Sequence, residues 1–543
     1  MGKRSNSTYV GNAAKKFESL EDSISNEYTK YCPTHNLDAV DTIALPENQD
    51  EIDAFLKNYV LERKPCKIIG VESQGSIINE LGVNNICDKF PSHDILQVER
   101  KVEGGFGSGE KRLRMTFQEF MGRLKMGESE LYLTTQYGGD HENSDVDHDD
   151  ENEGEEEDST AEELGSEQAF SKAADFSDTE SFIMDDAHDD FDEVFSSGQY
   201  EEAQESDTDA EEEEKQGETI IAELPSGALR ATEANQRVKE LYQPPMNSII
   251  NILPETPSFV GGLIPQQINL WIGSTAGNQQ SDDKSFLSNF DPTATNLGLG
   301  RFVPGGGSSS GLHHDHADNI YIPISGHKRF TLFSPKDAGK MYTRGVIRKV
   351  YNSGVIDYAR CEKSPFWRNL RDDGAIVAEV AHFELQNNPS LADADKERLQ
   401  KIVDQDERQI DAAYEQGKLD PPSFSSIVPA IIHLDKIEDG LVRDNIYNKA
   451  VEHWPLFFKA NRIAVDLGPG EMLYLPTGWF HEVTSFGKQG SSTLEDQIHV
   501  AVNYWFAPPN GTTTDNLYPN KDNYWSLDYE RTMTAVRASR NGP

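Results

Sequence analysis

Two histidines and an aspartate lie side by side in the sequence as His313-His314-Asp315. In a β-strand, residues two apart face the same side, so His313 and Asp315 could bind one metal ion while His314 points away. A mixed imidazole and carboxylate set suits Fe(II), Mn(II) or Zn(II). The pattern alone is more often a polar strand end than a metal site, so its surroundings decide the interpretation.

A third ligand can come from a strand much later in the chain. Residues 470–483 predict a strand, a tight turn and a second strand, and they place His481 just after the turn. An inward-facing imidazole at that position would complete a set of two histidines and one carboxylate. This set leaves three positions on the metal open, as in non-haem Fe(II) oxygenases.

The residues after the first two ligands predict a hairpin over residues 319–333, in which two β-rich runs meet at Ser325-Gly326. Its second strand carries Lys328. When one end of a dicarboxylate chelates a metal, its far carboxylate needs a cation, and Lys328 fits that role. Asn319 shares the odd-numbered parity of the two ligands. Asn503 lies in an apolar strand, where a buried amide requires polar partners.

Hydrophobic periodicity predicts the elements that would hold these residues. Two β-rich blocks interrupted by insertions indicate one double-stranded β-helix, or jelly roll, mostly β with flanking helices. Helices are expected from residue 48, from residue 117 and within 373–416, and strands at 67–71, 131–137 and 268–273. We divide the chain into a polar N-terminal tail 1–38, an N-terminal part of the domain 39–137, an acidic insertion 138–218, a core 219–508 with insertions 274–309 and 357–420, and a C-terminal tail 509–543.

The formal net charge of −44 is concentrated in one segment. Residues 139–218 contain 34 acidic and 2 basic side chains, a net charge of −32 that leaves −12 for the remainder. Such a segment cannot offset its backbone entropy by burying apolar surface, so we expect it to be disordered and able to attract a basic partner. Direct nucleic-acid binding is not expected, because a phosphate-binding face needs clustered Lys and Arg.

The sequence also sets expectations for location. There is no apolar run of about 18 residues and no apolar segment behind the basic N-terminus, so we expect neither a membrane span nor a secretory signal. The four cysteines are scattered and predict reduced thiols. A cytoplasmic or nuclear protein, or one in both places, is expected.

Several short segments together resemble the cupin-like branch of the JmjC family, to which fungal JmjC proteins and JmjC protein hydroxylases belong. The segments are 310–315, 318–321, 326–330, 333–335, 475–481 and 502–505, and the similarity extends to 48–71 and 131–133. The resemblance implies a jelly-roll fold and an Fe(II)- and 2-oxoglutarate-dependent oxygenase. It implies metal binding by His313, Asp315 and His481, and 2-oxoglutarate contacts from Lys328, Tyr132, Ser310, Asn319 and Asn503. Trp271 matches an aromatic residue of the pocket wall, with ordinary core packing as the alternative.

Three functions remain open at this point. The first is hydroxylation of a side chain of a partner protein. The second is N-methyl-lysine demethylation, made less favourable because four scattered cysteines offer no zinc module of the chromatin-reading kind. The third is a non-catalytic scaffold that binds basic partners through its acidic insertion, which an intact ligand set and Lys328 argue against.

Overall fold

The computed structural model describes residues 24–70, 75–91, 93–101, 105–106, 112–136, 231–275, 289–414 and 421–541. The predicted acidic insertion 138–218 lies outside these residues, so its expected disorder stays a prediction. In the described part, no helix has the length and apolar character needed to cross a membrane.

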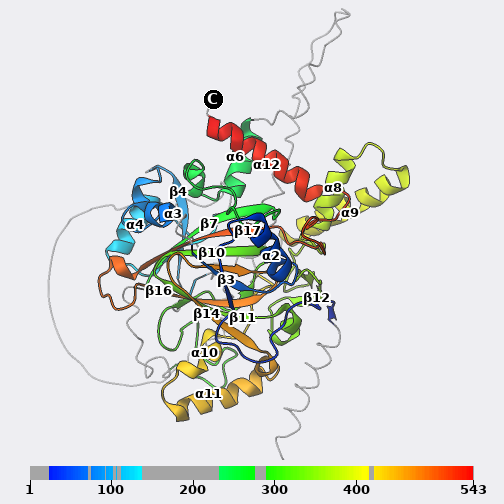
Figure 1. Cartoon of the computed structure of the whole chain (residues 1–543). Helices are drawn as coiled ribbons and strands as arrows, with labels where there is room; N and C mark the ends of the chain where they lie inside the picture. Colours follow the sequence, from blue (N-terminus) through cyan, green and yellow to red (C-terminus); the bar gives the residue numbers. More distant parts are fainter. Residues whose placement is uncertain are drawn as a thin grey trace, which may run out of the picture.

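Two large β-sheets form the centre of the molecule (Figure 1). In order across the first, nine-stranded sheet, the strands are β2 (Asp41–Ala44), β3 (Cys66–Ile69), β15 (Met472–Leu475), β10 (Asp318–Ser325), β17 (Ile498–Phe506), β7 (Pro265–Ser274), β6 (Leu131–Leu133), β4 (Ile95–Arg100) and β5 (Leu113–Thr116). The second sheet has the order β14 (Arg462–Leu467), β11 (His327–Phe333), β16 (Phe480–Phe486) and β8 (Ser308–Ser309), with β9 (His313–His314) paired to β16.

Along each strand of the first sheet, successive side chains point alternately into two apolar layers. In β10, Ile320, Ile322 and Ile324 belong to a cluster shared with the flanking helices, whereas Tyr321 faces the other way. Tyr321 joins a second cluster that contains Phe330 of β11 and other side chains of the second sheet. The two sheets therefore pack face to face, and the predicted jelly-roll fold is confirmed.

The predicted hairpin over 319–333 is wrong. Strand β10 pairs with β15 on one edge and β17 on the other, while β11 pairs with β14 and β16 in the second sheet. Both edges of each strand are thus occupied, and the chain crosses from one sheet to the other at Gly326. This glycine has φ +78°, and a Cβ there would lie 2.5 Å from the carbonyl oxygen of Phe486. Gly326 makes a tight corner between sheets rather than a hairpin turn.

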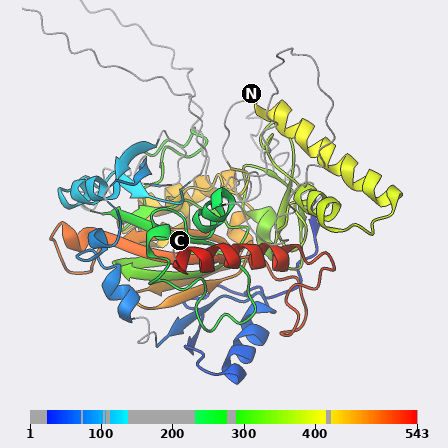
Figure 2. The same ribbon diagram turned by 90° about the horizontal axis from the view of Figure 1, so that it is seen from above.

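Helices pack against both sheets of the jelly roll. Among these, α6 (Ala231–Leu241) packs against β7 and against α12 (Tyr524–Asn541), which crosses the molecule beside it (Figure 2). The others are α2 (Gln49–Phe55), the π-helix η1 (Leu56–Val60), α3 (Gly75–Glu80), α4 (Phe117–Lys125), α8 (Val377–Asn387), α9 (Asp393–Tyr414), α10 (Pro429–Ile432) and α11 (Gly440–His453). A small third sheet consists of β1 (Ser25–Asn26), β12 (Val346–Val350) and β13 (Ile356–Ala359).

Several predicted boundaries differ from the structure. Residues 24–38 are packed rather than loose, because Tyr28 is fully buried and donates its hydroxyl to the carbonyl of Arg63. The predicted C-terminal tail contains the long helix α12. The predicted insertion 274–309 ends in strand β8 of the core, and the insertion 357–420 begins inside β13 before it forms α8 and α9.

Candidate metal centre

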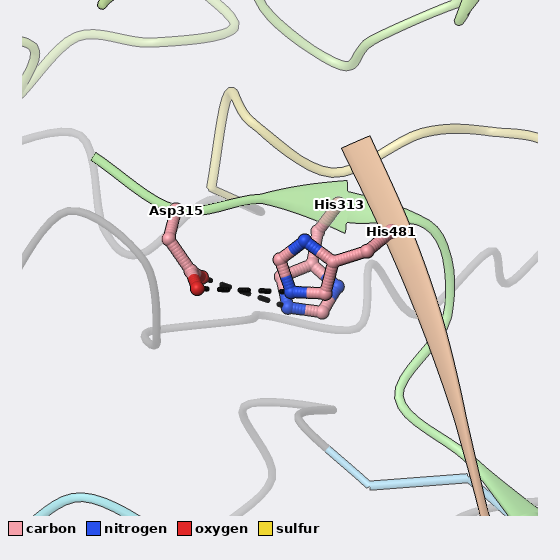
Figure 3. A group of neighbouring side chains, drawn as sticks. All are labelled: His313, Asp315 and His481. Atoms are coloured by element: carbon pink, nitrogen blue, oxygen red, sulfur yellow. Dashed lines mark ion pairs between the residues drawn. The ribbon is translucent and has the colours of Figure 1, made fainter. Parts of the chain in front are cut away.

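His313, Asp315 and His481 meet where β9 pairs with β16 (Figure 3). His313 and His481 are direct partners across the two strands, and Asp315 follows one residue after β9. One donor atom from each residue lies within 4.8 Å of the other two. The Nε2 atoms of His313 and His481 are 3.9 and 3.7 Å from the carboxylate oxygens of Asp315. These separations are too long for hydrogen bonds and leave the three donors converging on one point.

Backbone carbonyls orient both imidazoles toward that point. Nδ1 of His313 lies 3.1 Å from the carbonyl oxygen of Gly311, and Nδ1 of His481 lies 2.9 Å from that of Trp479. A carbonyl can only accept, so each Nδ1 carries the proton and each Nε2 keeps its lone pair. This arrangement fixes the tautomer that a metal ligand requires.

Burial keeps His313 in the neutral form. It lowers the pKa of His313 well below its ordinary value, and the neighbouring His481 lowers that pKa further. The side chains of His313 and Asp315 are 14% and 16% exposed, whereas that of His481 is 4% exposed. Two imidazoles and one carboxylate, open on one side, fit a divalent ion such as Fe(II) with free coordination positions.

The other histidines of this stretch face away from the three ligands. Nε2 of His314 lies 2.6 Å from the hydroxyl of Tyr358, and burial lowers the pKa of His314 to about 3. The ring of His316 packs at 4.7 Å from that of His314. The predicted outward direction of His314 is therefore confirmed, and the structure brings neither residue into the ligand group.

A buried ion pair holds the two ligand-bearing segments in place. Arg63 forms hydrogen bonds through both terminal nitrogens to Asp318, just downstream of Asp315. Asp318 also accepts from the backbone nitrogen and hydroxyl of Thr477, at 3.0 and 2.8 Å, on the turn before His481. On the same turn, the backbone nitrogen of Gly478 donates to the carbonyl of Asp315 at 3.1 Å. Remote parts of the chain thus set the spacing of the ligands.

Gly478 provides a direct test of this turn. A Cβ at Gly478 would lie 1.8 Å from the carbonyl oxygen of Gly354, and its φ is +75°. We expect Gly478→Ala to lower the free energy of unfolding by about 2 kcal/mol more than Gly490→Ala, measured by urea denaturation. Gly490 has φ +76° with nothing within 4 Å, so it carries the same backbone cost without the clash. Equal losses in the two variants would show that the contact with Gly354 does not constrain the turn.

Two of the residues predicted to bind a co-substrate, Lys328 and Tyr132, lie close to each other. Lys328 is fully buried and is the cross-strand partner of Ser485, on the face of β16 that also carries His481. Its Nζ donates to the Ser485 hydroxyl at 2.7 Å and lies 3.3 Å from Nδ1 of His499. The ring of Tyr132 is 6.0 Å from the same Nζ. The structure therefore brings Lys328 and Tyr132 together.

The two predicted asparagines form part of a chain of hydrogen bonds that ends at Asp315, one of the candidate metal ligands. The indole nitrogen of Trp271 donates to Asn503, which donates to Asn319, which donates to a carboxylate oxygen of Asp315, at 2.8, 3.2 and 3.3 Å. Strands β7, β17 and β10 position this chain. It orients Asp315 and gives Trp271 a polar contact beyond plain core packing.

Ser310 is placed differently from the other predicted co-substrate residues. Its hydroxyl donates to the carbonyl of Gly311 at 2.9 Å and accepts from the backbone nitrogen of Val483 at 3.0 Å. The bond from Val483 joins the segment before His313 to β16. In the structure, Ser310 supports the ligand strands, and its contact with a co-substrate stays a prediction.

Four residues near the site were missed by the sequence analysis. His499 has the same parity as Asn503 in β17 and could have been found from that spacing. Ser485 could likewise have been found from its parity with His481 on β16. Phe424, whose ring stacks on His313 at 4.8 Å, and Lys101, beside Tyr132, belong to no recognisable pattern.

Comparison with known proteins identifies the family of this chain. The family described as cupin-like domain matches residues 52–512. The JmjC domain-containing protein 4 of Schizosaccharomyces pombe is 30% identical over 52% of this chain and 62% of its own length. The JmjC domain-containing protein E of Dictyostelium discoideum is 27% identical over 41% and 44%, and the lysine-specific demethylase JMJ32 of Arabidopsis thaliana is 24% identical over 45% and 43%. The chain thus spans less than two thirds of the length of these relatives. It belongs to the cupin-like domain family and, within it, is similar to JmjC proteins.

Proposed function

We propose that this protein is an Fe(II)- and 2-oxoglutarate-dependent dioxygenase that hydroxylates a side chain of a partner protein. One observation carries the proposal: the lone pairs of His313 and His481 converge with the carboxylate of Asp315 on one point, on the face of the sheet that also carries the buried Lys328. This pairing of a metal site with a buried cation is what a chelating dicarboxylate needs.

The protein's own residues would position the reactants. His313, Asp315 and His481 would hold Fe(II), and Lys328 would bind the far carboxylate of 2-oxoglutarate through a charge-assisted hydrogen bond. Phe424, stacked on the ring of His313, would limit the access of water. Bound Fe(II) with 2-oxoglutarate and O₂ supplies the oxidative decarboxylation of the co-substrate and the transfer of an oxygen atom to a C–H bond.

Demethylation of N-methyl-lysine is the second candidate, and one relative supports it. JMJ32 of Arabidopsis thaliana is named a lysine-specific demethylase, and the similarity covers 45% of this chain. Hydroxylation of a methyl group would release formaldehyde, whereas hydroxylation of a carbon elsewhere in a side chain would leave one added oxygen atom. The two activities can therefore be separated by their products.

Mass spectrometry of partner proteins tests the assignment. We expect proteins captured by the full chain to gain one oxygen atom in cells that express the wild type, and not in cells that express His481→Ala. Release of formaldehyde from methyl-lysine peptides without that gain would favour demethylation. The absence of both products, with co-substrate turnover also absent, would favour a non-catalytic scaffold that binds basic partners through the acidic insertion.

A further inference from the structure

A second buried lysine lies next to Lys328. Lys101 directly follows strand β4, and its side chain reaches the ring of Tyr132. The Nζ atoms of Lys101 and Lys328 are 5.6 and 6.0 Å from the centre of that ring. Lys101 is 8% exposed and Lys328 is fully buried. Two lysine side chains from different parts of the chain therefore converge on one buried aromatic residue.

Within the described residues neither lysine forms an ion pair, although the carboxylates of Glu99 and Glu130 act on Lys101 from a greater distance. Within the described residues, the Nζ of Lys101 donates to the carbonyl oxygen of Ser274 at 2.7 Å, and no ion pair to it is found. Among the described residues, the Nζ of Lys328 contacts Ser485, His499 and the Tyr132 ring. Protonation of a buried lysine is costly without an ion pair, so an anion bound beside the two lysines would favour their charged forms.

A third polar group points to the same missing ligand. His499 is fully buried, and its Nε2 has no hydrogen-bond partner among the described residues. Its ring lies 5.7 Å from that of Tyr132, and its Nδ1 lies 3.3 Å from Nζ of Lys328. Buried polar atoms are rarely left without partners, so this one indicates a bound group or an ordered water. The lysines on the same ring select an anion.

We propose that Lys101 and Lys328 together form a two-lysine subsite for the far carboxylate of a dicarboxylate co-substrate, with Lys101 acting as a specificity-determining residue. This inference rests on the proposed function and extends it to a residue outside the jelly-roll motifs. One carboxylate between two ammonium groups replaces their mutual repulsion with two charge-assisted hydrogen bonds. The predicted consequence is a strong preference for a co-substrate that carries the second carboxylate over one that lacks it.

The charges around Lys101 predict how this preference changes with pH. Burial lowers the pKa of Lys101 to about 7, against the opposing pull of Glu99 and Glu130. Burial lowers the pKa values of Lys328 and His499, and the nearby Lys101 lowers them further. The ring of Tyr132 lies within 6.0 Å of both lysine Nζ atoms. A bound carboxylate favours the protonated lysine. Affinity is therefore greatest below about pH 7 and falls by up to about tenfold per pH unit above it.

The test measures binding rather than turnover. The full chain is loaded with Mn(II), and its affinities for 2-oxoglutarate and for 2-oxopentanoate, which carries a methyl group in place of the far carboxylate, are measured by calorimetry. We expect Lys101→Met and Lys101→Gln to weaken 2-oxoglutarate binding about tenfold or more, to leave 2-oxopentanoate binding unchanged, and to flatten the decline above pH 7. Lys125→Met, which removes a lysine of α4 that is 33% exposed, is the control and should change neither affinity.

Each result has a distinct meaning. If Lys328→Met weakens 2-oxoglutarate binding but both Lys101 variants keep the wild-type affinities, the two-lysine subsite is refuted and the proposed function stands. If the Lys101 variants unfold at lower temperature than the control and lose both ligands equally, Lys101 is structural and the inference also fails. If the protein without ligand unfolds at the same or a higher temperature after Lys101→Met, the inference is supported. In that case the substitution has removed a buried lysine that forms no ion pair in the absence of the ligand. If the wild type binds no 2-oxoglutarate, the proposed function fails together with the inference.

Discussion

Replacing Asp315 with Ala is expected to weaken Fe(II) binding by at least about a hundredfold. Asp315 supplies the one carboxylate of the ligand group, and both histidine Nε2 atoms are directed at its oxygens. Loss of residues that only support a ligand already costs about 10- to 100-fold in metal affinity, so loss of the anionic ligand itself should cost at least as much. Competition with a chelator under anaerobic conditions measures the effect.

Two matched controls separate ligation from general damage. His314→Gln changes the residue next to the ligands, but its Nε2 is bound to Tyr358 and does not face the metal. Asp466→Ala removes an aspartate whose side chain is 57% exposed on the outer strand β14. Both variants should bind Fe(II) like the wild type. If Asp315→Ala and His314→Gln weaken Fe(II) binding equally, then His313 and Asp315 have been wrongly assigned as ligands in place of His314.

Breaking the buried Arg63–Asp318 pair is expected to have the largest effect on stability. Arg63 is 2% exposed and Asp318 fully buried, and Asp318 also accepts hydrogen bonds from Tyr474 and Thr477. Arg63→Met leaves this carboxylate buried without its cation, which should lower the free energy of unfolding by about 3–5 kcal/mol in urea denaturation. Because Thr477 lies on the turn before His481, the same variant should also weaken metal binding.

The neighbouring residue provides the comparison. Lys64 forms a pair with Asp41 at 2.6 Å, with side chains that are 26% and 50% exposed. Lys64→Met should cost less than about 1 kcal/mol, because exposed ion pairs contribute little. Similar losses for Arg63→Met and Lys64→Met would mean that the buried pair does not hold the ligand segments together.

The candidate metal ligands were predictable from the sequence because their signals are local. Strand parity separates His313 and Asp315 from His314, and the structure directs His314 to Tyr358 as expected. The same parity reasoning relates Asn319 to Asp315, and a hydrogen bond joins them. Successive side chains of a strand point to opposite faces whichever strands pair with it, so this signal does not depend on the arrangement of distant strands.

The pairing of the strands was not predictable in the same way. Two β-rich runs joined by Ser325-Gly326 predict a hairpin, yet β10 and β11 lie in different sheets. A glycine with positive φ serves equally for a hairpin turn and for a corner between sheets. The choice between the two depends on which other strands are available for pairing. Here β10 pairs with β15 and β17, and β11 pairs with β14 and β16, all from distant parts of the chain.

Residues that support the site from a distance were not predictable either. Lys101 is one lysine among many, and its position beside Lys328 arises because β4 pairs with β6, which carries Tyr132. Arg63 meets Asp318 across 255 positions of sequence. Neither contact follows from spacing or composition, because both depend on how the two sheets and the N-terminal segment assemble.

The formation of succinate from 2-oxoglutarate tests the central claim most directly. The purified full chain is supplied with Fe(II), 2-oxoglutarate and O₂, together with an extract that contains partner proteins, and it is compared with His313→Ala under the same conditions. The arrangement of His313, Asp315, His481 and Lys328 predicts succinate from the wild type and none above background from the variant. Equal succinate from both, or none from a wild type shown to have bound Fe(II), would contradict it.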